Sequence, residues 1–225
     1  MKDILGAISA DVVDSTSLAI EDMIGLRDEI YNCFSDIKSC FPNSGFWGRL
    51  VKGDSIECCL DAPILSLRLV LLLKCRIKAW AADKSCSNAL KELGIRYSIG
   101  IGKMRIVDPV ADIMDGDAIY IAGRNLNRIT EAQLTSFFGM QSANMEIQTL
   151  ICTTVVLLDN VMNSLSAKQC IVIYHKLLGL TEQQISKLLL ISQSSVNTRA
   201  KKGGWNLIKD TLNIYEKIDF SAYVE

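Results

Sequence analysis

Histidine, net charge and long apolar runs are all scarce in this sequence, and each absence removes a simple assignment. The single histidine among 225 residues, His175, lies between apolar residues and is interpreted as a packing residue rather than a metal ligand. A net charge of −1 gives no overall attraction for nucleic acid, so any such function must depend on a local patch. With 49% hydrophobic and 22% charged residues, the composition is typical of a globular protein and excludes a disordered one.

The sequence also has no obvious membrane span, targeting segment or cysteine framework. The most apolar window, Ala62 to Cys75, is broken by Arg68 and ended by Lys74, which predicts a buried helix. The apolar stretch before Asp11 is too short for a signal peptide. Eight cysteines without a paired C-x2-C spacing indicate reduced thiols rather than a structural metal or disulfides. We therefore expect a cytoplasmic protein with no membrane partner.

The first 145 residues alternate strand and helix patterns. Apolar residues at helical spacing predict a helix over 18–41 and another from Pro63 to about Leu93. A third helix over 117–133 packs through Ile119, Ala122, Leu126 and Ile129. Strands are predicted over 3–10 and 95–107, and over 46–60 as a pair with a tight turn at 52–54. This order predicts an α+β, ferredoxin-like (palm) sheet domain with its helices on one face.

Beyond about Glu146 strand signals mostly vanish, so we place a domain boundary there, with domains 1–145 and 146–225. The second domain is predicted to be all-α, with a helix-turn-helix over about 165–208. Ser166 can cap one helix, and Gly179 ends it. Thr181 starts a short helix with Gln184 completing a capping box, and Ser192 starts the next helix after a tight turn.

The last of these helices has the composition of a DNA-reading helix. Val196 and Ala200 are expected to face inward, and polar side chains that can contact base edges are expected to face outward. These are Gln193, Ser194, Asn197, Thr198 and Lys201. The positively charged side chains of Arg199, Lys201 and Lys202 can bind DNA phosphates. From Val161 to Glu225 eight basic and five acidic residues give a net charge of +3. The alternatives are a three-helix bundle with a basic corner and a protein-docking helix-turn-helix.

The stretches "LSAKQ", "GLTEQQIS" and "ISQSSV" resemble the region-four type of helix-turn-helix found in sigma factors and related regulators. That family usually has glycine in the turn before "IS", whereas this sequence has Leu190. If the turn is the usual one, Leu190 adopts a backbone angle that costs a branched residue free energy.

Three motifs of the first domain resemble those of class III nucleotidyl cyclases: "SADVVDSTSL", "KGDSIECCL" and "GDAIYIAGR". The resemblance implies that Asp11 and Asp54 bind Mg²⁺ or Mn²⁺ with a nucleotide, and that Arg124 binds phosphate and is a candidate catalytic residue. The alternative roles are that Asp11 caps the following helix, that Asp54 shapes the hairpin turn, and that Arg124 pairs with one of them.

Other cyclase positions differ in this sequence. Asp14 stands where the family has glycine, and Tyr120 stands where it has a transition-state asparagine. The base-reading lysine falls on Leu50, although Arg49 and Lys52 flank it. The base-reading aspartate falls on Ile113, with Asp112 one residue away. Losing groups that stabilise charge slows phosphoryl-transfer enzymes by orders of magnitude. Asp14 would add negative charge beside a triphosphate, and it is equally suited to capping the next helix.

A cyclase-like part that ends in "GDAIYIAGRNLNRI" and is followed by this helical region resembles the SatD family over nearly the whole chain. That resemblance implies a bacterial cytoplasmic protein with a sheet domain and a DNA-binding helix-turn-helix. We therefore predict a homodimeric, DNA-binding transcriptional regulator whose degenerate cyclase-like domain serves as a sensor or dimerisation domain. Two alternatives are a metal-dependent nucleotidyl cyclase or nucleotidyltransferase and a protein-interaction adaptor.

Overall fold

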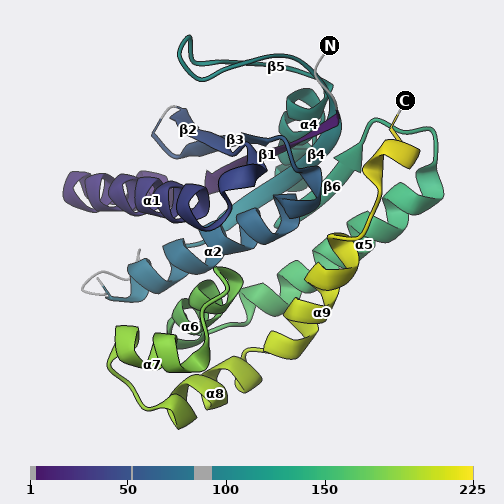
Figure 1. Ribbon diagram of the computed structural model, residues 1–225. Helices are drawn as coiled ribbons and strands as arrows, with labels where there is room; N and C mark the ends of the chain where they lie inside the picture. The colour runs from purple at the N-terminus through teal and green to yellow at the C-terminus, as the bar shows by residue number, and fades with distance from the viewer. Residues whose placement is uncertain (1–3, 52, 84–92, 225) are drawn as a thin grey trace.

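The computed structural model describes residues 4–51, 53–83 and 93–224. Its centre is a mixed sheet in the order β2-β3-β1-β4-β5, with β6 pairing parallel to β4 (Figure 1). The strands are β1 (Ile4–Val12), β2 (Trp47–Val51), β3 (Ser55–Leu60), β4 (Ile95–Asp108), β5 (Ile113–Gly116) and β6 (Ser136–Met140). The order β2-β3-β1-β4 is that of a ferredoxin-like core, as the sequence predicts.

The helices of this part cover both faces of the sheet, so the prediction that they share one face is wrong. Along β1 alternate residues point to opposite sides. Ile8 and Ala10 pack with α1 (Ile20–Cys40) and α2 (Ser66–Asp83), whereas Leu5 and Ala7 pack with α4 (Asp117–Glu131). Figure 1 shows α2 and α4 on opposite sides of the strands.

Glycine allows α4 to pack closely on β4. A Cβ atom at Gly100 would lie only 2.1 Å from the carbonyl oxygen of Ala118, so the helix backbone occupies the space of a side chain. Gly102 also faces α4, and its Cβ atom would lie 3.2 Å from the Ala118 amide. The run "SIGIG" therefore belongs to a strand that is buried on both faces.

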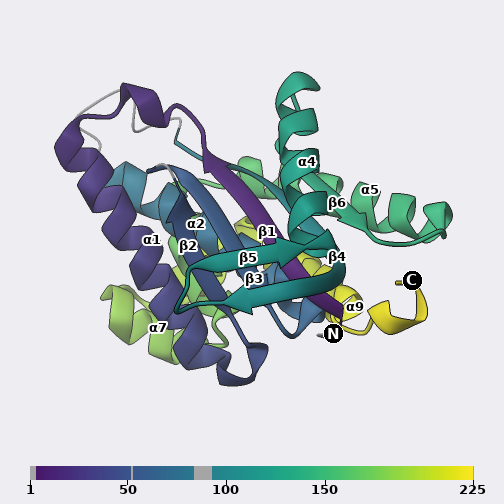
Figure 2. The same ribbon diagram turned by 90° about the horizontal axis from the view of Figure 1, so that it is seen from above.

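Sequence patterns predict the longer elements but miss β5 and β6. These strands have four and five residues, too few for a clear alternation of apolar and polar side chains. The β4–β5 hairpin curls back over the sheet (Figure 2). Asp112 near its tip contacts Arg49 of β2. The predicted helix from Pro63 to about Leu93 corresponds to a short 3-10 turn and α2, which ends at Asp83, and residues 84–92 lie outside the described part.

From residue 145 onward the described chain is helical, as predicted. The helices are α5 (Met145–Asn163), α6 (Ala167–Leu177), α7 (Glu182–Leu189), α8 (Gln193–Lys202) and α9 (Trp205–Tyr215). Val155 and Ile173 belong to the same buried cluster as Ile8 of β1. The Ser66 and Tyr215 hydroxyls lie 2.7 Å apart, and Arg68 pairs with Glu216 at 2.6 Å. The proposed boundary near residue 146 therefore lies within one continuous core.

The helix starts of the C-terminal part follow the sequence prediction closely. Capping boxes join Ser166 to Gln169 and Thr181 to Gln184, and the Ser192 hydroxyl accepts the Ser195 amide. Leu190, in the turn between α7 and α8, is left-handed with φ 52° and ψ 41°, which confirms the expected backbone angle. Val172, Ile185 and Val196 form a small core between α6, α7 and α8.

Helix α5 is the one described helix whose length and apolar composition would suffice to cross a membrane. Its most apolar window has a mean hydropathy of 1.3 and is 28% buried. The core helix of a globular protein meets the same criteria of length and composition. The most apolar window of the sequence, 62–75, includes the first part of α2, which is buried as predicted.

Candidate functional site

The predicted metal residue Asp11 lies at the end of β1 and is paired with an arginine. In the sheet register it stands opposite Ser55 of β3 and Arg96 of β4. Arg96 donates two hydrogen bonds to its carboxylate, Nε to Oδ1 at 3.1 Å and Nη2 to Oδ2 at 2.6 Å. About a quarter of each side chain is exposed, 24% for Asp11 and 27% for Arg96. Asp11 is therefore held rigidly by its neighbour and does not cap a helix.

The second predicted metal residue, Asp54, belongs to the turn between β2 and β3. Its carbonyl oxygen accepts the Val12 amide at 3.3 Å, so its backbone lies directly beside the end of β1. Its carboxylate accepts the Ser15 hydroxyl at 2.6 Å. The structure thus brings the backbones of the two predicted strand ends together, while each carboxylate has a different protein partner.

Asp14 lies in the loop that follows Asp11. Its backbone is left-handed, with φ 59° and ψ 21°, a conformation that glycine adopts without cost. Its carbonyl accepts the Ser17 amide at 3.2 Å and the Ser17 hydroxyl at 2.7 Å, closing a short 3-10 turn. Its side chain is exposed and makes no capping hydrogen bond, so the predicted capping role is wrong. The loop keeps the shape of a glycine turn although the residue carries a charge.

Arg124 is exposed on α4, and its guanidinium lies over the ring of Tyr120, 6.0 Å from the centroid. The Tyr120 hydroxyl donates to Asp115, and this hydrogen bond lowers the pKa of the Asp115 carboxyl. A Cβ atom at Gly123 would lie 4.0 Å from the Ser9 hydroxyl, which places this turn of α4 over β1. Since Ser9 and Asp11 point to the same side of β1, Arg124 and Asp11 belong to one face of the sheet.

The residues beside the expected base-reading positions contact one another. Arg49 pairs with Asp112 at 3.2 Å and with Glu57 at 2.7 Å. Asp112 has φ 56°, which turns the β4–β5 hairpin toward β2. Arg49 and Asp112, each one residue away from a base-reading position of the cyclases, are therefore bound to each other.

Asp11 and Asp54 are the two predicted metal ligands. In residues 4–51, 53–83 and 93–224, no three His, Cys, Asp or Glu side chains are close enough to hold a metal ion. The carboxylates of Asp11 and Asp54 are hard oxygen donors of the kind that Mg²⁺ and Mn²⁺ prefer. These two carboxylates fit such an ion in chemical type only.

Sequence reasoning missed Arg96 as a site residue. It precedes Tyr97 in a strand that was predicted correctly, but its role depends on the pairing of β1 with β4. A strand pattern alone does not specify which residue lies opposite Asp11, so the only available signal was a basic residue in an otherwise apolar run.

The predicted DNA-contacting residues are spread around the free side of α8. Val196 and Ala200 are buried as expected, at 0% and 3% exposure. Five of the named side chains are exposed: Gln193, Ser194, Thr198, Lys201 and Lys202. Arg199 and Asn197 are half-buried, and the Asn197 amide donates to the Glu182 carboxylate at 3.3 and 3.4 Å. Asn197 is thus turned toward α7.

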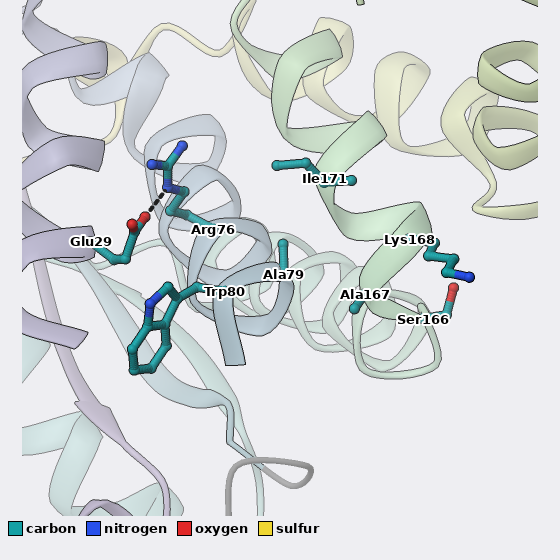
Figure 3. A pocket seen from close by; sticks show the side chains of 8 residues that line it. All are labelled: Glu29, Arg76, Ala79, Trp80, Ser166, Ala167, Lys168 and Ile171. Atoms are coloured by element: carbon teal, nitrogen blue, oxygen red, sulfur yellow. Dashed lines mark hydrogen bonds and ion pairs between the residues drawn. The ribbon is translucent and has the colours of Figure 1, made fainter. Parts of the chain in front are cut away.

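A cavity of about 600 Å³ lies between α1, α2 and the start of α6 (Figure 3). Arg76 in this cavity is bound to Glu29 at 2.5 Å, and Lys168 extends away from Arg76 and Trp80. Ser166 is already used as the cap of α6. Since the charged groups do not converge on the space, we assign it no ligand.

No protein-family model and no curated protein matches the chain. Its structural neighbours include a bacterial light-regulated adenylyl cyclase, with a TM-score of 0.46 and 15% identity, over 60% of this chain and 74% of the other. The guanylyl cyclase Cya2 matches with a TM-score of 0.42 and 13% identity, over 56% and 70% of the two chains. The guanylate cyclase domain of RhGC from Catenaria anguillulae, in complex with GTP, matches with a TM-score of 0.38 and 15% identity, over 55% and 71%. The SatD and helix-turn-helix assignments stay predictions.

Proposed function

We propose that the sheet part of this chain binds a nucleoside triphosphate with a divalent cation, at the end of β1 beside the β2–β3 turn. The observation that carries the proposal is the 3.3 Å hydrogen bond from the Val12 amide to the Asp54 carbonyl. It joins two strand ends that each bear a carboxylate, Asp11 and Asp54. Two neighbouring carboxylates with access to solvent are suited to a hard cation that also binds phosphate oxygens.

The loop after Asp11 supplies the groups that would contact the phosphates. Its left-handed turn at Asp14 is followed by Ser15, Thr16 and Ser17. The Ser15 and Ser17 hydroxyls already donate to Asp54 and to the Asp14 carbonyl, so the exposed Thr16 hydroxyl is the one offered to a phosphate. Arg124 lies over the same face of the sheet and is exposed, so its guanidinium is available to an anionic ligand. The exposed Asp14 carboxylate opposes binding by repulsion.

Arg96 orients the Asp11 carboxylate, and a cation would have to share its two oxygens with the positively charged guanidinium. Its two hydrogen bonds fix both oxygens of the carboxylate, and its charge offsets the negative charge beside Asp54. A bound cation would polarise the phosphate and lower the barrier to attack at phosphorus. We propose binding with slow or no turnover, because Tyr120 replaces the transition-state asparagine and its hydroxyl is engaged by Asp115.

The test is titration of a fluorescent ATP or GTP analogue in the presence of Mn²⁺. Asp11→Asn and Asp54→Asn should each weaken binding at least tenfold, while Asp14→Gly should strengthen it about fivefold by removing about 1 kcal/mol of repulsion. Asp210→Asn, an exposed carboxylate on α9, is the matched control and should leave the affinity unchanged.

Binding that is absent in the wild type, or that does not depend on Asp11 and Asp54, would refute the proposal. The same samples, assayed for cyclic or linked nucleotide product, separate a binding domain from an enzyme. Product that disappears in Asp11→Asn and Asp54→Asn would establish the metal-dependent cyclase or transferase alternative.

The second candidate function is DNA binding through α8. It is favoured by the row of exposed polar and basic side chains on a helix whose other side, Val196 and Ala200, is fixed in a three-helix core. A helix of this kind can enter a major groove, and in this proposal Lys201 and Lys202 at its end bind phosphates.

Duplex DNA binding is measured as a function of salt concentration. Changing Lys201 and Lys202 to alanine should reduce the salt slope by about 0.9 for each phosphate that a lysine neutralises in the wild type. Lys217→Ala, an exposed lysine beyond α9, should not change the slope. If the wild type does not bind duplex DNA at low salt, α8 has another role, such as the predicted protein-interaction adaptor.

A further inference from the structure

The outer side of α5 and α9 is an apolar surface of large side chains. Leu150 and Leu157 of α5 are 65% and 62% exposed, and Leu207 and Ile214 of α9 are 54% and 70% exposed. Each of these residues would bury substantial apolar area if another surface covered it, at about 25 cal/mol per Å². We call these four residues, with Thr154 and Thr211, the α5–α9 face.

The two helices carry the same side-chain pattern on this face. Leu150, Thr154 and Leu157 follow one another at intervals of four and three residues, and Leu207, Thr211 and Ile214 do the same. This spacing keeps side chains on one stripe of a helix and is the repeat by which helices pack along a seam. The Thr154 hydroxyl donates to the Leu150 carbonyl at 2.9 Å, which leaves its methyl group for packing.

The stripes lie next to each other and are separated by a groove. A hollow of about 740 Å³ is lined by Thr154, Leu157 and Val161 from α5 and by Leu207 and Thr211 from α9. Figure 1 shows the two helices running in opposite directions, and the start of α9 at Gly204 approaches Val161. A ridge of side chains from another helix fits such a groove.

The charges of α5 favour a protein partner over a lipid surface. Glu146 and Asp159 are its only charged residues, and Asp159 is buried against Lys74 at 2.5 Å. Helix α5 contains no lysine or arginine, the residues that bind interfacial helices to anionic lipids, and the one lysine of α9, Lys209, is followed by the acidic Asp210. An uncharged stripe with the same spacing on both helices is complementary to a second copy of itself.

The size of the face is close to the requirement of a dimer. With 19 and 11 residues, α5 and α9 are about 28 Å and about 16 Å long and about 10 Å wide, a projected area of roughly 450 Å². Because the side chains and the groove make the surface uneven, its accessible area exceeds this projection and approaches roughly 600 Å² per partner, the lower limit of specific interfaces.

We propose that the α5–α9 face is a homodimer interface, in which α5 and α9 of two copies pack as a four-helix bundle about a two-fold axis. The pairing is isologous, because the same stripes serve as ridge and groove in both copies. It does not depend on nucleotide or DNA, and the interface consists of residues of neither proposed binding site.

Sedimentation velocity of the full chain over a range of concentrations tests the proposal. The wild type should sediment as a dimer at micromolar concentration, and Leu157→Glu and Leu207→Glu should each raise the dissociation constant at least 100-fold. Both positions are exposed in the monomer, so circular dichroism should show an unchanged fold. Val110→Glu is the matched control, an apolar residue that is 98% exposed on the β4–β5 turn, and it should leave the dimer intact.

A wild type that stays monomeric at 100-fold higher concentration would overturn the proposal, as would a dimer that persists in both glutamate variants. Flotation with vesicles of phosphatidylcholine, alone or with phosphatidylglycerol, tests the other occupant. A monomer that binds these vesicles and loses the binding in Leu157→Glu would assign the face to a membrane instead.

Discussion

At the scale of single residues, Leu190 combines an unfavourable backbone angle with almost complete exposure. Its φ of 52° is costly for a residue with a Cβ atom, and 91% of the residue is open to solvent, so it gains little from packing. We expect Leu190→Gly to raise the free energy of unfolding by about 0.5–1 kcal/mol, the relief of strain exceeding the entropy that glycine adds to the unfolded chain. Urea unfolding followed by circular dichroism measures the change.

The matched control for this substitution is Leu188→Gly, two residues earlier. Leu188 is 57% exposed but lies inside α7, where glycine costs about 1 kcal/mol. The two variants should therefore change stability in opposite directions. A loss of stability in both would show that the left-handed turn is not strained by leucine.

His175 makes stability depend on pH near neutrality. It is 8% exposed and packs edge-on against Tyr174, and burial lowers its pKa from 6.5, with the charge of Arg76 acting in the same direction. The unfolded chain therefore takes up a proton at higher pH than the folded chain does. The contribution of His175 to stability should be constant above about pH 7.5 and decrease as the pH falls through 6.5 toward the lowered pKa, by at most about 1.4 kcal/mol per pH unit.

Urea unfolding at pH 7.5, 6.5 and 5.5 measures this dependence, and His175→Phe is the comparison. Since His175 is the only histidine, the variant should lose most of the slope between pH 7.5 and 6. An equal slope in both proteins would assign the dependence to other groups.

At the scale of secondary-structure elements, local chemistry is predictable and packing is not. The caps Ser166, Thr181 and Ser192 act through residues three positions away, so a short window of sequence contains all the necessary information. The close packing of α4 on the sheet depends on Gly100. The role of this glycine can be recognised only once the position of α4, which follows it in sequence, is known. The same limit applies to Asp11, whose partner Arg96 lies 85 residues away.

The packing of α2 against α5 depends on a buried ion pair. The Lys74 ammonium lies 2.5 Å from the Asp159 carboxylate, and their side chains are 4% and 0% exposed. Thr135 and Asn163 also donate to Asp159. Asp159→Leu should lower the free energy of unfolding by about 3–5 kcal/mol, because it leaves a buried charge without its partner.

The double variant Lys74→Met with Asp159→Leu shows whether the loss of stability comes from the unpaired charge or from lost packing. Replacing both charges by apolar groups of similar size should recover most of the stability that Asp159→Leu removes. If the double variant is as unstable as the single one, the hydrogen bonds of Thr135 and Asn163 dominate the site.

At the scale of the whole molecule, the sheet part and the helical part share one hydrophobic core. The largest buried cluster extends from Ile8 in β1 through Leu71 in α2 to Val155 in α5 and Leu212 in α9. Composition places a boundary near residue 146 because strand patterns end there. Periodicity shows which residues of α2 are buried but not which elements cover them. Composition therefore does not reveal that helices beyond residue 146 cover this apolar helix.

A shared core predicts a single cooperative unfolding transition. Trp47 lies in β2 and Trp205 at the start of α9, so each reports on one side of the predicted boundary. Two variants that each keep one of these residues, with the remaining tryptophans changed to phenylalanine, should give the same urea midpoint by fluorescence and by circular dichroism.

The fragment 1–144 should fail to fold, because it exposes the buried side of α2 and leaves Lys74 without Asp159. Separate midpoints, or a fragment that unfolds cooperatively by itself, would instead show two independent domains divided near residue 146.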